Sequence, residues 1–232
     1  MSLFLPHTHD MQSPTVIGNH FSTYTRSIRM ALIHLGVSFQ FEQADPHSPL
    51  AYKHNPFGRI PSFLHKDKAI FETLAIREYI DAVISDKLTP KDLDTRIKMT
   101  QMISILNDYV FHHVLFGISK RRDMYELQGK TEEEIKQLLK EPLKKAVTII
   151  QGVDKLVPCD GQKFLCGEQL TWADFLFFPV MADMYAIREG SDFIACSPNL
   201  RQWFLTFQAR KEAKETFPGT IADTLSKKKS NI

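Results

Sequence analysis

The chain has few cysteines, no excess of one charge and no long apolar run. Its three cysteines form no CxxC pair, which excludes a disulfide framework and a zinc ribbon and favours a reducing compartment such as the cytoplasm. With 29 basic and 27 acidic residues, it lacks the basic field that nucleic-acid binding needs. No apolar stretch reaches the roughly 18 residues of a membrane span, and the N-terminus lacks a secretory-signal pattern. We therefore expect a cytoplasmic protein without nucleic-acid or membrane partners.

The first 85 residues alternate between the two-residue period of strands and the spacing of amphipathic helices. The predicted elements are, in order, a strand at 15–18, a helix through Ile28, Ala31, Leu32 and Leu35, a strand at 37–41, a loop with Pro46 and Pro49, a hairpin of 60–64 and 69–71, and a helix from Thr73 to Val83. This order, βαβ followed by ββα, indicates a compact α+β unit.

After a polar stretch at 85–94, the apolar spacing becomes helical and no strand is predicted. We therefore expect two domains, 1–85 and 95–232, joined by the linker 86–94. The second domain should open with one long helix at 95–118. The predicted fold class is α+β, with an all-helical second domain.

Two later helices are predicted to begin with a hydroxyl residue followed three positions on by an acid, which is the pattern of a capping box. The pairs are Thr131 with Glu134 and Thr171 with Asp174. The second pair opens a helix that is apolar nearly all round, so we assign it to folding and expect it to be buried. A last helix should begin near Ser197, and the basic tail beyond it should be a frayed end.

The segment GRIPSF, residues 58–63, and the pair Glu72 and Thr73 suggest a site for a short peptide. An X-Pro bond tolerates the cis form, so Pro61 would leave the backbone of Ile60 free to pair with an extended ligand. Glu72 and Thr73 stand where a helix begins, and free N–H groups there bind carboxylates. Glu72 would hold an ammonium group, and Thr73 a carboxylate.

Three linked motifs resemble the cytosolic glutathione S-transferases: NPFGRIPSF at 55–63, FETLAIREYI at 71–80 and LTWADF at 170–175. The similarity runs from Thr15 to about Phe207, and the stretch 47–63 is most like the phi class among the serine-type enzymes. The resemblance implies a thioredoxin-like N-terminal domain, an all-helical C-terminal domain, glutathione as co-substrate, no metal, and a homodimer.

The same resemblance implies a role for Ser22, which falls where theta-, zeta- and phi-like enzymes carry their catalytic hydroxyl. Omega-like thiol reductases have cysteine there, so thiol–disulfide exchange is disfavoured. No tyrosine stands near Ile17, where a tyrosine-type enzyme would carry one. Ser22 would donate its hydrogen to the glutathione sulfur and stabilise the thiolate. Read without this context, Ser22 could equally be an ordinary helix N-cap.

Further positions are assigned to ligand binding. Arg59, helped by His47, would bind the glycyl carboxylate of glutathione. The electrophile pocket would be lined by Tyr24, Tyr109, His112 and His113. Ordinary packing or solvent exposure is an alternative for these four side chains.

The histidine pairs also invite a metal interpretation. Neighbouring helical side chains such as His112 and His113 point about 100° apart and do not chelate one ion easily. His7 and His9 form the other pair. We predict no metal site.

The predicted function is conjugation of glutathione to small hydrophobic electrophiles, as in detoxification. Three alternatives remain: a protein that binds glutathione or apolar ligands without turnover, an interaction module like the transferase-like part of translation elongation factors, and a zeta-type glutathione-dependent isomerase. The sequence names neither the electrophile nor the class.

Overall fold

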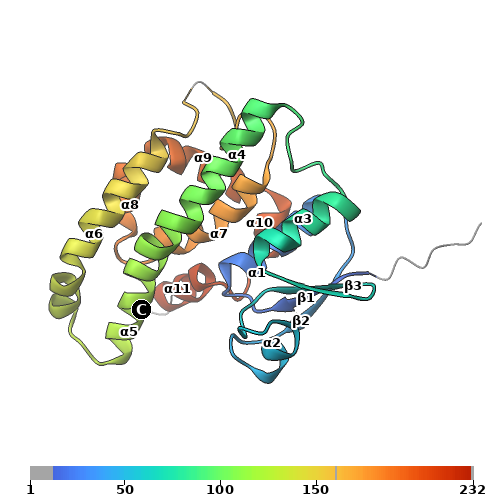
Figure 1. Ribbon diagram of the computed structural model, residues 1–232. Helices are drawn as coiled ribbons and strands as arrows, with labels where there is room; N and C mark the ends of the chain where they lie inside the picture. Colours follow the sequence, from blue (N-terminus) through green and yellow to red (C-terminus); the bar gives the residue numbers. More distant parts are fainter. Residues whose placement is uncertain (1–12, 160, 231–232) are drawn as a thin grey trace, which may run out of the picture.

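The computed structural model describes residues 13–159 and 161–230. They form a four-stranded mixed sheet with helices on both faces, followed by a helical region (Figure 1). The elements of the first part are β1 (Thr15–Gly18), α1 (Thr23–His34), β2 (Gln40–Gln43), α2 (Pro49–His54), β3 (Ser62–His65), β4 (Lys68–Phe71) and α3 (Thr73–Val83). The predicted α+β class and the thioredoxin-like order of elements are confirmed.

The strands lie in the order β2-β1-β3-β4, with β1 parallel to β2 and antiparallel to β3. Strand β2 begins at Gln40, later than predicted, because Gly36 and Val37 close helix α1. The Val37 N–H donates to the Leu32 carbonyl at 2.9 Å, and Gly36 adopts a φ of 71° that favours glycine. Val37 therefore belongs to the helix cap.

The prediction of a plain loop around Pro46 and Pro49 is wrong in its second half, where α2 forms. Ser48 is the N-cap of this helix, and its Oγ accepts from the Ala51 N–H at 3.2 Å. Pro49 occupies the first turn, where its missing N–H costs nothing. The Ile60–Pro61 bond is cis, as expected, and β3 begins after it at Ser62.

In the second part, no strand is assigned to the described residues after Phe71. Its elements are α4 (Leu93–Ile105), the π-helix η1 (Leu106–Lys120), α5 (Arg121–Leu127), α6 (Glu132–Asp154), α7 (Trp172–Ala186), α8 (Gly190–Cys196), α9 (Pro198–Gln208), α10 (Lys211–Glu215) and α11 (Ile221–Ser230). Figure 1 shows α4 leading through η1 into α5 as one long helix beside α6. The predicted long helix is thus present, but its middle has a π-helical hydrogen-bond pattern.

The helix predicted at Ser197 is α9, and it is not the last helix. Helices α10 and α11 follow it, and α11 packs on α7. Within α11, Lys227 Nζ donates to Asp223 Oδ2 at 2.7 Å, one helical turn earlier. The expectation of a frayed basic tail is therefore wrong for the described residues. His7 and His9 lie outside them.

Helix α7 is the centre of the core and connects the two parts of the chain. Its residues from Trp172 to Met184 are buried, and it packs against α1. The indole N–H of Trp172 donates to Asp81 of α3 at 2.8 Å. The guanidinium of Arg26 on α1 stacks on Phe178 of α7. These contacts hold the N-terminal end of α1 and the C-terminal end of α3 against the helical region. A site at the start of α1 therefore has a rigid frame.

Among the described residues, no helix combines the length and the apolar character that a membrane span requires.

Candidate active site

A cleft of about 840 Å³ opens between the sheet part and helix η1. Eight of the ten predicted site residues line it: Ser22, Tyr24, His47, Arg59, Ile60, Glu72, Thr73 and His112. They come from the ends of α1 and α3, from two loops and from η1, so folding gathers residues that are far apart in the sequence.

Ser22 is the N-cap of α1 and faces the cleft. Its Oγ accepts from the Thr25 N–H at 3.2 Å, and its own N–H donates to Asn19 Oδ1 at 2.9 Å. Because Oγ serves here as an acceptor, its hydroxyl hydrogen remains available as a donor to a ligand in the cleft. Ser22 therefore both caps the helix and offers a hydrogen bond beside the positive end of the helix dipole.

Glu72 is the N-cap of α3 and has a φ of 65°, in the left-handed region that glutamate rarely adopts. Such a conformation costs on the order of 1 to 3 kcal/mol and is concentrated at functional sites. No side-chain hydrogen bond caps the helix at Glu72, whose carboxylate is exposed toward the cleft. Thr73, which follows, is buried at the first turn. The pair thus presents a carboxylate next to free helix N–H groups.

The loops before β3 supply a third edge of the cleft. The His47 N–H donates to the Gly58 carbonyl at 2.7 Å, which joins the loop of His47 to that of Arg59 and Ile60. Gly58 has a φ of 63°, and a Cβ there would lie 2.7 Å from the ring of Tyr52. The position therefore requires glycine. The side chain of Arg59 is exposed and makes no ion pair with the described residues.

Helix η1 forms the opposite wall, and most of its contribution was missed by sequence reasoning. Tyr24 Oη donates to Asn107 Oδ1 at 2.6 Å, and its ring stacks on Phe111 with centroids 4.8 Å apart. Burial, and then the charge of Glu72, raises the pKa of Tyr24 well above its usual value, so its phenol stays protonated. The remaining η1 residues along the wall are Asp108, His112, Leu115, Phe116 and Lys120.

The structure does not bring Tyr109 and His113 to the cleft. Tyr109 is 53% exposed and does not line it. His113 does not line it either, and its pKa is lowered by burial and then by the charge of Lys145 on α6. Each lies one residue away from a position that faces the cleft, and one residue is enough to turn a helical side chain onto another side.

Asp183 of α7 forms part of the floor of the cleft, although no pattern in the sequence assigned it there. It is only 3% exposed, and burial raises its pKa to about 7 despite the opposing charge of Arg26. Arg26 is itself buried and donates to Thr216 Oγ1 and to the Ala213 carbonyl. The only available signal was an acid within the apolar run of α7.

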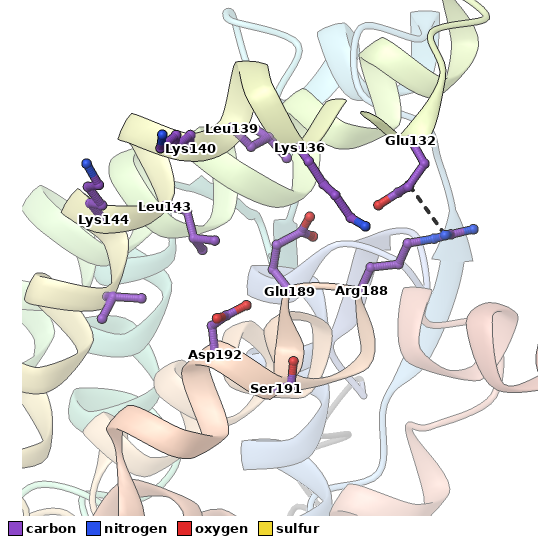
Figure 2. A pocket seen from close by; sticks show the side chains of 11 residues that line it. Glu132, Lys136, Leu139, Lys140, Leu143, Lys144, Arg188, Glu189, Ser191 and Asp192 are labelled. Atoms are coloured by element: carbon purple, nitrogen blue, oxygen red, sulfur yellow. Dashed lines mark ion pairs between the residues drawn. The ribbon is translucent and has the colours of Figure 1, made fainter. Parts of the chain in front are cut away.

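A second cavity, of about 570 Å³, lies away from this cleft, between α6 and the segment around α8. Figure 2 shows the side chain of Lys136 directed toward Glu189 and Arg188, while Arg188 pairs with Glu132 at 3.4 Å. None of the predicted site residues lines this cavity. Within the described ranges, no three histidine, cysteine or acidic side chains lie so that they could hold a metal ion.

Comparison with known proteins gives matches along most of the chain. Residues 13–82 match the family model "Glutathione S-transferase, N-terminal domain", and residues 108–211 match "Glutathione S-transferase, C-terminal domain". A probable glutathione S-transferase, parA, from Nicotiana tabacum is 26% identical over 90% of this chain and 91% of its own length. Glutathione S-transferase F6 of Arabidopsis thaliana is 37% identical, over 31% of this chain and 37% of its own length.

Solved structures show the same fold. Glutathione transferase F7 from Populus trichocarpa superposes with a TM-score of 0.72 at 18% identity, covering 89% of this chain and 98% of its own. A glutathione transferase homologue from Drosophila mojavensis, solved with bound glutathione, gives a TM-score of 0.74 at 24% identity and covers 92% of this chain and 94% of its own. At these identities the likeness concerns the arrangement of the backbone.

Proposed function

Since the chain belongs to the glutathione S-transferase family, we propose that it is an enzyme that binds glutathione in this cleft, activates its thiol and conjugates it to a small hydrophobic electrophile. The observation that carries the proposal is the convergence on one cleft of the Ser22 hydroxyl, the Glu72–Thr73 helix start and the backbone of Ile60. The Ser22 hydroxyl can donate a hydrogen bond to a sulfur. The helix start and the backbone of Ile60 can hold a peptide.

The peptide would lie along the edge formed by the two loops and α3. Glu72 would hold the ammonium of the γ-glutamyl group, and Thr73 with the N–H groups of α3 would hold its carboxylate. No hydrogen bond with the described residues uses the Ile60 N–H or carbonyl, so both are available to pair with the ligand backbone. Arg59, with His47 beside it, would bind the glycyl carboxylate.

The chemical step requires a thiolate. A thiol with a pKa of about 8.5 is ionised to only about 3% at pH 7, so a lower pKa raises the concentration of the nucleophile. Ser22 would donate its hydrogen to the sulfur, and the N-terminus of α1 would add its positive field. The sulfur then attacks the electrophilic carbon, a carbon–sulfur bond forms, and the leaving group departs with its electron pair.

A conjugation assay tests this function directly. We expect purified protein with glutathione and an activated aryl halide to form a thioether product, which mass spectrometry would identify. Glutathione binding by calorimetry without any product would instead support the non-catalytic binding protein. Absence of both would contradict the proposed function.

Replacement of Glu72 by glutamine should weaken glutathione binding. The substitution keeps the shape but removes the charge that faces the ammonium, so the binding free energy should become less favourable by about 1.5 to 3 kcal/mol. Calorimetry would measure it. Glu78→Gln is the matched control, because Glu78 lies on the same helix with a side chain that is 76% exposed. An unchanged affinity in a folded Glu72→Gln protein would mean that the ligand lies elsewhere.

A homodimer is also proposed, on the basis of family membership. It is supported by exposed apolar side chains on the sheet part, among them Phe57, which is 64% exposed, and Tyr52, which is 51% exposed. Light scattering at micromolar concentration should give about twice the chain mass of 26.7 kDa. A single species of the chain mass would contradict the dimer.

A further inference from the structure

We propose, resting on the transferase function above, that the electrophile taken by this cleft is a planar aromatic compound with an anionic group. The rings of Tyr24, Phe111 and Phe116 would form the face on which it stacks, and Lys120 would pair with the anion. All four side chains line the same cleft that contains Ser22.

The π-helical pattern of η1 brings Phe111, Phe116 and Lys120 to one wall, opposite the start of α1 that carries Tyr24. In an α-helix, neighbours on one face are three or four residues apart, whereas the i to i+5 bonds of a π-helix widen this spacing to four or five. The wall follows the wider spacing, from Asn107 through Phe111 and Phe116 to Lys120. At about 100° per residue, an α-helix would place Lys120 roughly 140° away from Asn107. The π-helical pattern therefore keeps Asn107 and Lys120, at the two ends of η1, on the same wall of the cleft.

The three aromatic rings contact one another in sequence, beginning near the proposed sulfur position. Tyr24, two residues after Ser22, stacks on Phe111 with an interplanar angle of 26°. Phe111 contacts Phe116 with centroids 5.0 Å apart. This contact joins residues i and i+5, which an α-helix would point in different directions. A flat ring that packs against an outer side of this aromatic cluster gains offset stacking in addition to apolar burial.

Lys120 supplies a positive charge at the far end of the face. Its Nζ lies 3.7 Å from Asp123 Oδ2, and the side chains of Lys120 and Asp123 are 37% and 48% exposed, so water screens this pair. Asp183 is the other acid close to Lys120; it is buried, and burial raises its pKa, which favours its neutral form. Asp108 lies near the opposite end of η1. An anion at this end of the cleft would therefore meet an ammonium that is not fully neutralised.

A matched pair of electrophiles tests the proposal: 4-chloro-3-nitrobenzoate and its methyl ester. In both, the glutathione thiolate attacks the carbon that bears chlorine, the carbon–sulfur bond forms, and chloride leaves with the bonding electrons. Each kcat/KM is divided by the rate of the uncatalysed reaction, because the ester is intrinsically more reactive. The measured quantity is the ratio of the normalised value for the acid to that for the ester.

Lys120→Ala should lower this ratio about tenfold, because only the acid loses a charge-assisted hydrogen bond. Lys120→Arg should keep it within about threefold of the original, since the charge remains. Lys136→Ala, which removes a lysine from the separate second cavity, is the control and should leave the ratio unchanged. An unchanged ratio in Lys120→Ala, or an equal change in Lys136→Ala, would overturn the proposal.

Binding of the chemically prepared conjugates separates this proposal from the proposed function. The acid and ester conjugates with glutathione need no turnover to bind, and calorimetry gives the ratio of their affinities. If no turnover occurs but Lys120→Ala shifts the affinity ratio about tenfold, the anion site stands and the transferase function fails. If turnover occurs and neither ratio moves, the transferase function stands and the anion site fails.

Discussion

Ser22→Ala should lower conjugation near neutral pH by about 10- to 150-fold and leave glutathione binding nearly intact. The lost hydrogen bond to a charged sulfur corresponds to about 1.5 to 3 kcal/mol of stabilisation. Binding should persist because the peptide would be held by Arg59, Ile60, Glu72 and Thr73, which line other parts of the cleft. Steady-state kinetics and calorimetry would measure the two effects separately.

Ser48→Ala is the matched control for the capping role of Ser22. Ser48 caps α2 as Ser22 caps α1, each accepting a backbone N–H at 3.2 Å, but Ser48 does not line the cleft. Both alanine variants should lose about 1 kcal/mol of stability from the missing cap. Only Ser22→Ala should lose turnover. Equal turnover in the two variants would mean that Ser22 only caps α1 and has no role in catalysis.

The pH dependence of kcat/KM for the electrophile, measured with the enzyme saturated by glutathione, gives a sharper test of Ser22. A donor to the sulfur favours the charged form, so the apparent pKa of bound glutathione should lie below that of the free thiol, near 8.5. In Ser22→Ala this pKa should rise toward the free value, and the activity lost at neutral pH should partly return as the pH increases. The same apparent pKa in both proteins would point to another donor, with Thr23 and Tyr24 the next to test.

Ser22→Cys should redirect the chemistry toward thiol exchange. A cysteine at this position could form a mixed disulfide with glutathione disulfide, and mass spectrometry would detect the added glutathione. Capture at position 22, and not at the native Cys159 in the parent protein, would place Ser22 beside the sulfur site. A folded variant without capture would place it elsewhere.

Asp174→Ala should give the largest loss of stability, lowering the free energy of unfolding by about 3 to 5 kcal/mol. The carboxylate of Asp174 is fully buried and accepts four hydrogen bonds, from the Leu165 N–H, the Thr171 N–H, Thr171 Oγ1 and Trp203 Nε1, at 2.8 to 3.0 Å. Alanine would leave these donors buried without an acceptor. The protein would then lose the hydrogen bonds and also bear the desolvation penalty of the unpaired donors. Urea unfolding would measure the free energy.

Glu134→Ala provides the comparison, because the same motif opens α6 at the surface. Glu134 accepts from the Thr131 N–H and Oγ1 at 2.7 and 3.0 Å, and water can replace it there. We expect a loss of about 1 kcal/mol or less. If the two substitutions lower the free energy of unfolding equally, burial would not explain the contribution of the Asp174 hydrogen bonds to stability.

The parts of the candidate site that the sequence revealed are those defined by local chemistry. Glu72 stands where a hairpin pattern changes to a helical one, and proline permits the cis form of the Ile60–Pro61 bond. The position of Ser22 came from the resemblance to serine-type enzymes. The capping boxes at Thr131 and Thr171 were also visible, since each needs only residues three positions apart. Such features depend on neighbours along the chain, so periodicity and residue type suffice to predict them.

The short helix α2 also had a local signal, Ser48 followed by Pro49, which indicates an N-cap and a first helical turn. The two prolines close together, Pro46 and Pro49, favour a loop as well, so the local pattern alone does not decide between the two. The helices after α9 were missed because their apolar residues are few, and they are held by packing on the rest of the chain, as α11 is on α7.

The sequence by itself determined the order of the four strands, the places of α1 and α3 among them, and the residues that begin these two helices. Only the tertiary structure decided which side of the long second-part helix faces the cleft. Periodicity assumes about 3.6 residues per turn, and η1 departs from that value, so Phe111, Phe116 and Lys120 face the site in place of Tyr109 and His113. Asp183 likewise reaches the floor of the cleft because α7 packs against α1, a contact between segments far apart in the chain that no local pattern encodes.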